Sequence, residues 1–190
     1  MANNKKAIKN LTHKSLERAA LYHLKRYSSS SENLRRVLIR RVLREFSQLD
    51  ANMSIYKEWV NEIVEKLISI GLLNDERYAE MKCLSLHKSG KSQYQIRNKL
   101  LEYGLSVAVV EHSLKMLNNY QVDCELIAAV ITARRKKLGP YRTADKKNLA
   151  KNHDMAKFAR AGFSYGIATR IMEFSNPEDL DEELEMLRKQ

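Results

Sequence analysis

Clusters of arginine and lysine recur along this sequence, each beside a break between two predicted helices. The first cluster holds Lys25, Arg26, Arg35, Arg36, Arg40 and Arg44. The second holds Lys88, Lys91, Arg97 and Lys99, and the third holds Arg134, Arg135, Lys136, Lys137, Arg142, Lys146 and Lys147. Spaced cations neutralise the phosphates of a polyanion, and such binding weakens steeply as salt rises. We therefore predict an extended basic track that binds a continuous polyanion or the groove of a filament.

A tyrosine lies close to each of these breaks, at Tyr27, Tyr94 and Tyr141. Tyrosine rings stack on exposed nucleic-acid bases. The same rings could instead pack against the turns and hold them in place. Both interpretations stay open for all three positions.

Residues typical of catalytic or metal sites occur without the partners that such sites need. The run Ser89-Gly90-Lys91-Ser92 has part of a phosphate-binding loop, but Ser85 stands where that motif needs glycine, and a predicted helix precedes it. Cys83 and His87 lie four residues apart, but no second pair of ligands with zinc spacing accompanies them. The sequence predicts a binding protein rather than an enzyme, with no metal and no cofactor.

The overall charge is +11 and is unevenly distributed. Residues 173–190 hold seven acidic and two basic side chains, so 1–172 carry a net charge of +16. A body of that charge favours an anionic partner. Two cysteines without close spacing are typical of a reducing compartment, and neither a signal peptide nor a membrane span is apparent. We expect a cytoplasmic monomer with no membrane contact.

The elements that carry these charges are predicted to be helices, since glycine and proline are scarce and apolar residues recur at i, i+3 and i+4. Helices are expected to begin at N-terminal caps. A capping box is expected from Ser29 to Glu32, and single caps are expected at Ser15, Ser54, Asn74, Ser92, Ser106 and Asn176. Gly104 is expected to end a helix. A helix is also expected over 146–160.

The order of these helices predicts an all-α, elongated tandem array of three three-helix repeats. The expected parts are a basic tail at 1–14, repeats at 15–73, 74–120 and 121–175, and an acidic helix at 176–190. The acidic helix could cover the end of the array or lie on a basic face and compete with the ligand. We expect Cys83, Trp59 and Phe163 in the core.

The motifs that begin and end these segments resemble those of the RecX family. The resemblance rests on the run from Gly71 to Ala79, on Lys88 to Ser92, and on Gly104-Leu105-Ser106 with its echo at Gly162-Phe163-Ser164. It spans roughly 15–174, and Asn74 departs from the acid usual there. The resemblance implies a regulator that binds RecA filaments on single-stranded DNA, suppresses ATPase activity and strand exchange, and limits filament extension.

Two other functions fit the same composition. A direct nucleic-acid-binding protein, whose main ligand is DNA or RNA itself, would use the same cations without any role for RecA. The expected nucleic-acid partner is single-stranded DNA, with double-stranded DNA as the alternative. A helical scaffold would carry the cations only as a solvated surface. Binding that depends on RecA favours the RecX-like regulator, and equal binding to bare nucleic acid favours the direct binder. If neither kind of binding occurs, the scaffold is favoured.

Overall fold

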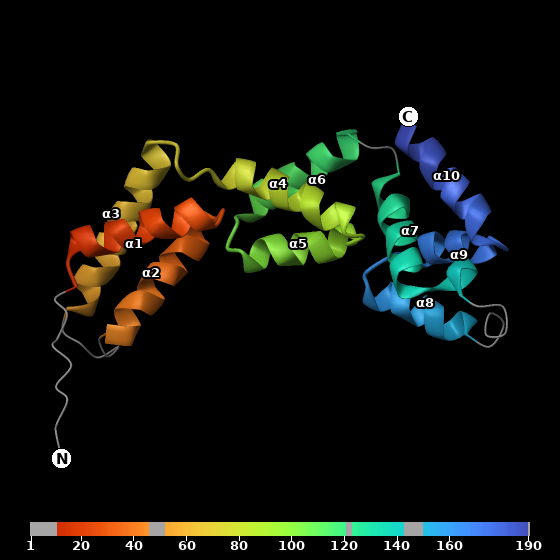
Figure 1. Cartoon of the computed structure of the whole chain (residues 1–190), viewed down its shortest axis with the longest axis horizontal. Helices are drawn as coiled ribbons and strands as arrows, with labels where there is room; N and C mark the ends of the chain where they lie inside the picture. The colour runs from red at the N-terminus through yellow and green to blue at the C-terminus, as the bar shows by residue number, and fades with distance from the viewer. Residues whose placement is uncertain (1–10, 46–51, 121–122, 143–149, 190) are drawn as a thin grey trace, which may run out of the picture. The chain divides into compact units, whose positions relative to one another are not determined.

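The computed structural model describes residues 11–45, 52–120, 123–142 and 150–189 (Figure 1). Within these ranges it has ten α-helices, one 3-10 turn and no strand, which confirms the all-α class. The helices are α1 (His13–Arg26), α2 (Ser31–Glu45), α3 (Met53–Ser69), α4 (Asp75–Lys88), α5 (Gln93–Glu102), α6 (Val107–Tyr120), α7 (Cys124–Lys136), α8 (Lys151–Arg160), α9 (Tyr165–Glu173) and α10 (Pro177–Lys189). The 3-10 turn η1 (Gly139–Tyr141) lies between α7 and α8.

The chain forms two compact units, one of residues 1–78 with 103–105 and one of 79–102 with 106–190. The division into three repeats stays a prediction. None of the helices in the described part of the chain is long and apolar enough to cross a membrane.

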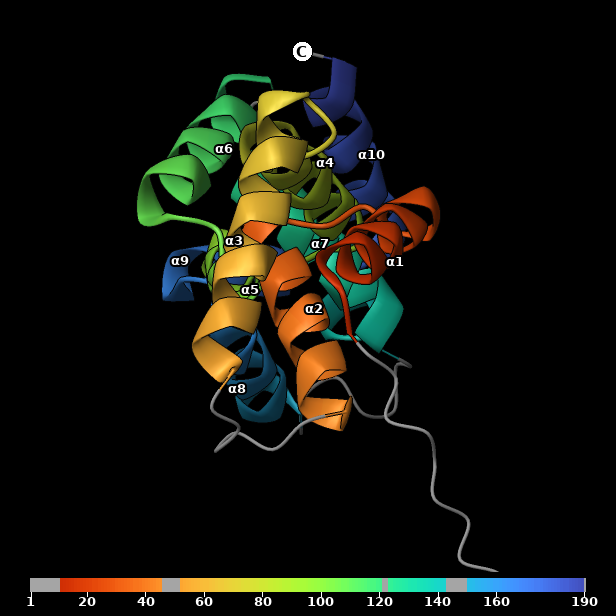
Figure 2. The ribbon, with the colours of Figure 1, turned by 90° about the vertical axis from the view of Figure 1, so that its left-hand side faces the viewer.

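The first unit is built on α1, α2 and α3, with α2 packed along α3 (Figure 2). Leu16 and Ala20 of α1, Leu34 and Leu38 of α2 and Ile63 of α3 are almost fully buried. Their spacing of three to four residues places them on one face of each helix. Trp59 is partly buried against this core, as predicted.

Three of the predicted caps in the first unit are wrong by a few residues. Thr12, not Ser15, caps α1, since its hydroxyl accepts from the Ser15 backbone N–H at 3.2 Å. Ser30, not Ser29, caps α2 by accepting from the Asn33 N–H at 3.1 Å. Ser54 lies inside α3, which begins at Met53 after Asn52.

Tertiary contacts explain the choice at α2, where four serines in a row can all act as caps. The Ser31 N–H and hydroxyl donate to the carboxylate of Asp75 at 2.8 and 2.6 Å, and the Ser30 hydroxyl donates to the Tyr103 carbonyl. These contacts come from residues far along the chain, so local sequence could not select among the serines.

The second unit has a core that runs from α7 to α10. Phe158 of α8, Leu126 of α7, Ile171 of α9 and Leu180 of α10 are all fully buried in it. Phe163 and Cys83 are buried as predicted. The acidic helix α10 therefore contributes Leu180 and Leu184 to this core.

Predicted helix ends in the remaining part of the chain are mostly confirmed. The side chains of Asn74, Ser92, Ser106 and Asn176 each accept a hydrogen bond from the backbone N–H three residues later. Gly104 has φ +80°, the left-handed conformation expected after a helix. The predicted helix over 146–160 is described only from Lys151 to Arg160, and 146–149 lie outside the described residues.

Candidate nucleic-acid interface

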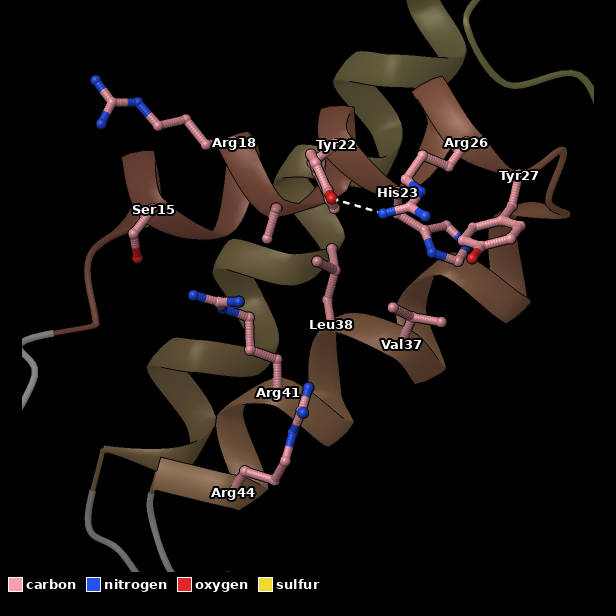
Figure 3. Close-up of a pocket in the computed structure, with 11 residues that line it drawn as sticks. Ser15, Arg18, Tyr22, His23, Arg26, Tyr27, Val37, Leu38, Arg41 and Arg44 are labelled. Atoms are coloured by element: carbon pink, nitrogen blue, oxygen red, sulfur yellow. Dashed lines mark hydrogen bonds between the residues drawn. The ribbon is translucent and has the colours of Figure 1, made fainter.

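A groove between α1 and α2 brings together four arginines of the first unit. The groove has a volume of about 630 Å³ and is lined by Arg18, Arg26, Arg41 and Arg44 together with the rings of Tyr22, His23 and Tyr27. Tyr22 and Tyr27 are 63% and 56% exposed, which is high for large rings. Figure 3 shows Tyr22, His23, Arg26 and Tyr27 at one end of the groove, with Arg41 and Arg44 extending from α2.

Helical spacing explains the lining. Arg18, Tyr22 and Arg26 lie four residues apart on α1, so they share one face at intervals of about 6 Å. Arg41 and Arg44 lie three apart on α2 and meet that face from the other side. The floor between them is apolar, because Leu38 is buried there and Val37 and Ala19 line it.

The cations in this groove have no carboxylate partner within the residues that the structure describes. Arg26 donates to the Tyr22 hydroxyl at 2.7 Å, and its guanidinium carbon lies 5.6 and 5.9 Å from the ring centres of Tyr22 and Tyr27. Arg44 donates to a backbone carbonyl at 3.4 Å. Their charge therefore remains available to an anion.

Two polar atoms in the same groove are buried without a hydrogen-bond partner among the described residues, Nε2 of His23 and Nε of Arg41. Burial, together with the charge of Arg40, lowers the pKa of His23, so its ring is neutral at neutral pH. Buried polar atoms are nearly always paired in folded proteins. Hydrogen bonding is therefore incomplete at these two positions beside the groove.

Two of the other predicted cations of the first unit pair with carboxylates. Arg35 pairs with Glu65 at 2.5 Å and Arg36 with Glu32 at 3.2 Å, while Arg40 donates to the Arg36 carbonyl. Lys25 is exposed on α1. The sequence analysis missed Arg18, Tyr22, His23 and Arg41, although the four-residue spacing of Arg18, Tyr22 and Arg26 was a signal that could have found the first two.

In the second unit, the turn between α4 and α5 draws several cations together. Arg135 donates to the Ser89 carbonyl at 2.7 Å and Thr132 to the Gly90 carbonyl at 2.5 Å. The Ser92 hydroxyl donates to the Ala161 carbonyl at 2.5 Å. The ends of α7 and α8 are thereby fixed beside residues 89–92.

These contacts form a cluster, here named the turn cluster, of Lys91, Arg135, Lys136, Lys157 and Arg160. Partial burial and the charges of the other four members lower the pKa of Lys136. Like charges brought together in this way favour an anion between or above them. The sequence predicted the first three members and missed Lys157 and Arg160, which α8 adds through folding.

Gly90 and Gly162 allow the close packing around this turn. Both have φ near +80°, and a Cβ at Gly90 would lie 2.8 Å from the Thr132 hydroxyl oxygen. A Cβ at Gly162 would lie 2.7 Å from the ring of Tyr94. Tyr94 is nevertheless 62% exposed, so its other face is open.

Arg134 and Tyr141 are instead occupied by the acidic helix α10. Arg134 pairs with Asp181 at 2.5 Å, and the Tyr141 hydroxyl donates to the same carboxylate. Burial and Asp181 raise the pKa of Tyr141 to about 12. Arg170 of α9 also bonds to Glu183 of α10. Of the two roles considered for α10, the structure thus shows it both completing the core and lying on basic residues.

The remaining predicted cations of the second unit are placed as follows. Arg97 pairs with Glu111 at 3.1 Å and Lys99 with Glu102 at 2.7 Å. Arg142 bonds to Asp154, which is 1% exposed and also accepts from the Gly139 N–H at 2.9 Å. Lys88 and Lys137 are exposed, while Lys146 and Lys147 lie outside the described residues. The charge of Arg142 is therefore used to neutralise the buried carboxylate of Asp154.

Neither metal ligands nor a cofactor cradle stands out at these surfaces. Over 11–45, 52–120, 123–142 and 150–189, no group of three His, Cys, Asp or Glu side chains could hold a metal ion. His87 is buried and its Nε2 lies 2.8 Å from the Cys124 carbonyl oxygen. The chemistry of the site is that of cations, aromatic rings and hydrogen-bond donors.

Comparison with known proteins shows the family. The chain is 43% identical over 163 residues to a regulatory protein RecX of Myxococcus xanthus, covering 85% of this chain and 86% of that one. The chain belongs to the RecX family. A regulatory protein RecX of Agrobacterium fabrum is 30% identical over 164 residues, covering 86% of this chain and 84% of that protein.

A solved structure shares the fold of this chain. The crystal structure of RecX from Lactobacillus salivarius has the same fold, with a TM-score of 0.63 at 23% identity, covering 90% of this chain and 97% of that one. No family model matches the chain. The relatives are named as regulators, so the basic surfaces are those of a regulatory RecX protein.

Proposed function

We propose that this RecX-family protein binds RecA filaments on single-stranded DNA and inhibits ATPase activity, filament extension and strand exchange. It would act in the cytoplasm in DNA repair, homologous recombination and the SOS response. The observation that carries the proposal is that each of the two units presents cations without acidic partners among the described residues, the α1–α2 groove in one and the turn cluster in the other.

Two basic surfaces on separate units suit a nucleoprotein filament better than a single small ligand. Binding through several phosphates gains affinity from every neutralised charge. Linking two weak contacts in one chain raises the effective concentration of the second contact once the first has formed. A protein held in this way along a filament groove would exclude a second DNA strand and hinder the addition of RecA.

The test is the ATPase activity of RecA on single-stranded DNA, with this protein titrated in at near-physiological salt. A fall in activity at substoichiometric protein is expected, because one bound molecule would affect several RecA subunits or a growing end. Unchanged activity at concentrations that saturate bare DNA would overturn the proposal.

A matched pair of variants sharpens this test. Lys91→Glu alters the turn cluster, whereas Lys115→Glu makes the same change of net charge at an exposed residue of α6 outside the cluster. Only the first variant should need more protein for the same inhibition. Equal inhibition by both variants would remove the turn cluster from the interface.

A direct nucleic-acid-binding function is the second candidate. It is favoured by the exposed tyrosines in the arginine-lined groove, on which unpaired bases can stack. Equal, steeply salt-dependent binding to DNA or RNA with and without RecA would favour this candidate.

A further inference from the structure

The α1–α2 groove combines three properties that one ligand class would use together. It has cations on both walls, from Arg18 of α1 and from Arg41 and Arg44 of α2. It has exposed aromatic faces at Tyr22 and Tyr27. Polar atoms of His23 and Arg41 are also buried there, unpaired within the described part of the chain. Each property points to a ligand that carries anionic groups, flat rings and polar edges.

The side chains along α1 alternate between arginines, which bind anionic groups of a ligand, and a tyrosine ring, on which a flat group can stack. Arg18, Tyr22 and Arg26 alternate cation, ring and cation at one turn of helix each, about 6 Å apart. Nucleic-acid strands alternate in the same sense, since each nucleotide joins a phosphate to a base. An acidic peptide would satisfy the arginines but would leave the tyrosine faces without a partner.

An unpaired strand fits these rings better than a duplex. The bases of a duplex are stacked on one another inside the helix, so exposed tyrosines cannot reach their faces. Every unpaired base has a face on which an aromatic ring can stack, and such stacking needs no particular sequence. Arginine also stacks on aromatic planes, so Arg26, already beside both tyrosines, extends the same platform.

Two arginines of α2 outside this groove are neutralised by carboxylates. On α2, Arg35 and Arg36 are paired with Glu65 and Glu32. Arg41 and Arg44, further along the same helix, have no carboxylate in ion-pair range within the described residues. The groove's volume of about 630 Å³ falls in the range of small-ligand sites, enough for a segment of a strand rather than its whole length.

We propose that the α1–α2 groove binds a short segment of single-stranded nucleic acid, with bases on Tyr22 and Tyr27 and phosphates on the arginines of both helices. The proposal deepens the proposed function and rests on it for the choice of nucleic acid, but its test needs no RecA.

The experiment measures binding of the full-length protein to fluorescent oligothymidylate of about 12 nucleotides, within the site sizes of single-strand binders. An abasic strand of equal length supplies the phosphates without bases. The wild-type protein should bind the oligothymidylate at least about fivefold more tightly than the abasic strand, since stacking adds to the attraction between charges. Equal affinity for the two strands would overturn the role of the tyrosines.

Two variants test the two halves of the groove separately. Tyr22→Leu with Tyr27→Leu should lower affinity for oligothymidylate to the level of the abasic strand and leave abasic binding unchanged. Arg18→Glu with Arg44→Glu should weaken both and flatten the dependence of log K on log salt by about 0.7 for each phosphate that is no longer neutralised. Wild-type affinity in either variant would exclude the groove as the site.

Controls keep these outcomes interpretable. Lys57→Glu with Lys82→Glu makes the same change of net charge as Arg18→Glu with Arg44→Glu, but on other helices. This control should leave oligothymidylate binding within about twofold of wild type, because its charges lie outside the groove. Circular dichroism melting curves identify any variant that fails to fold, and the exposed Tyr27→Leu alone then replaces it. Polyglutamate that competes as well as oligothymidylate would show a groove for acidic protein and overturn the proposal.

The results also separate this inference from the proposed function. Oligothymidylate binding through the groove, without inhibition of RecA ATPase, would keep the inference and reject the RecA role. If the wild-type protein inhibits RecA ATPase but the groove variants bind oligothymidylate normally, the RecA role is kept and the groove inference is rejected.

Discussion

The two units place the same pair of residue types, an arginine beside a tyrosine, in opposite electrostatic settings. Arg26 lies over the rings of Tyr22 and Tyr27, and no carboxylate pairs with it within the described residues. Arg134 lies 5.9 Å from the ring centre of Tyr141, but Asp181 of α10 bonds to both of them. Similar side chains therefore form an open site in one unit and a neutralised contact in the other.

The formal charge of a side chain thus does not decide whether that charge is available to a ligand. A carboxylate at hydrogen-bond distance offsets an arginine more effectively than any anion free in solution, because it is already held in place. The nearby turn cluster is the opposite case in the same unit, since its five cations face one another without such a partner among the described residues.

The largest effect is expected where a buried charge holds the second unit together. Asp154→Asn should lower the stability of that unit by about 2–3 kcal/mol, because the Gly139 N–H and Arg142 lose a buried, charged acceptor. Both cysteines lie in this unit and are buried, so their reaction rate with a thiol reagent measures its opening. Burial raises the pKa of Cys83 to about 11, which keeps the native thiol unreactive near pH 8.

This variant also tests whether the units are independent. Thiol labelling should accelerate, while oligothymidylate binding by the α1–α2 groove should not change at temperatures below unfolding. Loss of binding in step with labelling would show that the groove depends on the second unit.

The pH dependence of the same variant has a definite sign. Burial alone raises the pKa of Asp154, but its hydrogen bonds from Arg142 and Gly139 outweigh that effect and lower the pKa below its ordinary value. A carboxylate with a lowered pKa stabilises the fold above its unfolded value and loses that contribution as the pH falls. Asp154→Asn should therefore cost most at neutral pH and progressively less below about pH 4, the ordinary range of an aspartate.

A smaller effect is expected at the turn cluster. Arg135→Glu with Lys136→Glu should weaken binding to RecA filaments about tenfold, because two cations become anions at an exposed surface. Lys115→Glu serves as the control on α6. Reversal of all four residues from Arg134 to Lys137 would be a poorer test, because Arg134→Glu would also place an acid beside Asp181 and destabilise α10.

The smallest effect is expected from removing the acids of α10. Asp181→Asn with Glu183→Gln should raise affinity for single-stranded DNA about threefold at low salt, since Arg134 loses its carboxylate partner and Arg170 keeps only Asp123. Exposed pairs of this kind contribute about 0.2–1 kcal/mol each, so the melting temperature should fall slightly. Glu182→Gln with Glu185→Gln, at exposed positions on the same helix, is the matched control; an equal gain there would attribute the effect to net charge.

Much of the fold followed from local sequence. Ser106 caps its helix as predicted because Leu105 and Val107 beside it have no side-chain acceptor. Asn176 does so because Pro177 suits the first helical position, and Asn74 does so while Asp75 accepts from Ser31. The caps near Ser29 were misplaced because several hydroxyl residues stand in a row and Asp75 and Tyr103 select among them. Arg41 and Arg160 could not be assigned to a site, because their relation to α1 and to the turn at 89–92 exists only after folding.

Local sequence was enough to establish the all-α class, the family and the excess of positive charge, because helix periodicity, capping residues and formal charge are local properties. Which cations remain available was settled by the packing of the helices. Arg134 and Arg142 meet carboxylates, while Arg18 and Arg44 face a groove. Electrostatic attraction falls off within a few ångströms when water and salt intervene, so the availability of each charge depends on neighbours that only the packed helices supply.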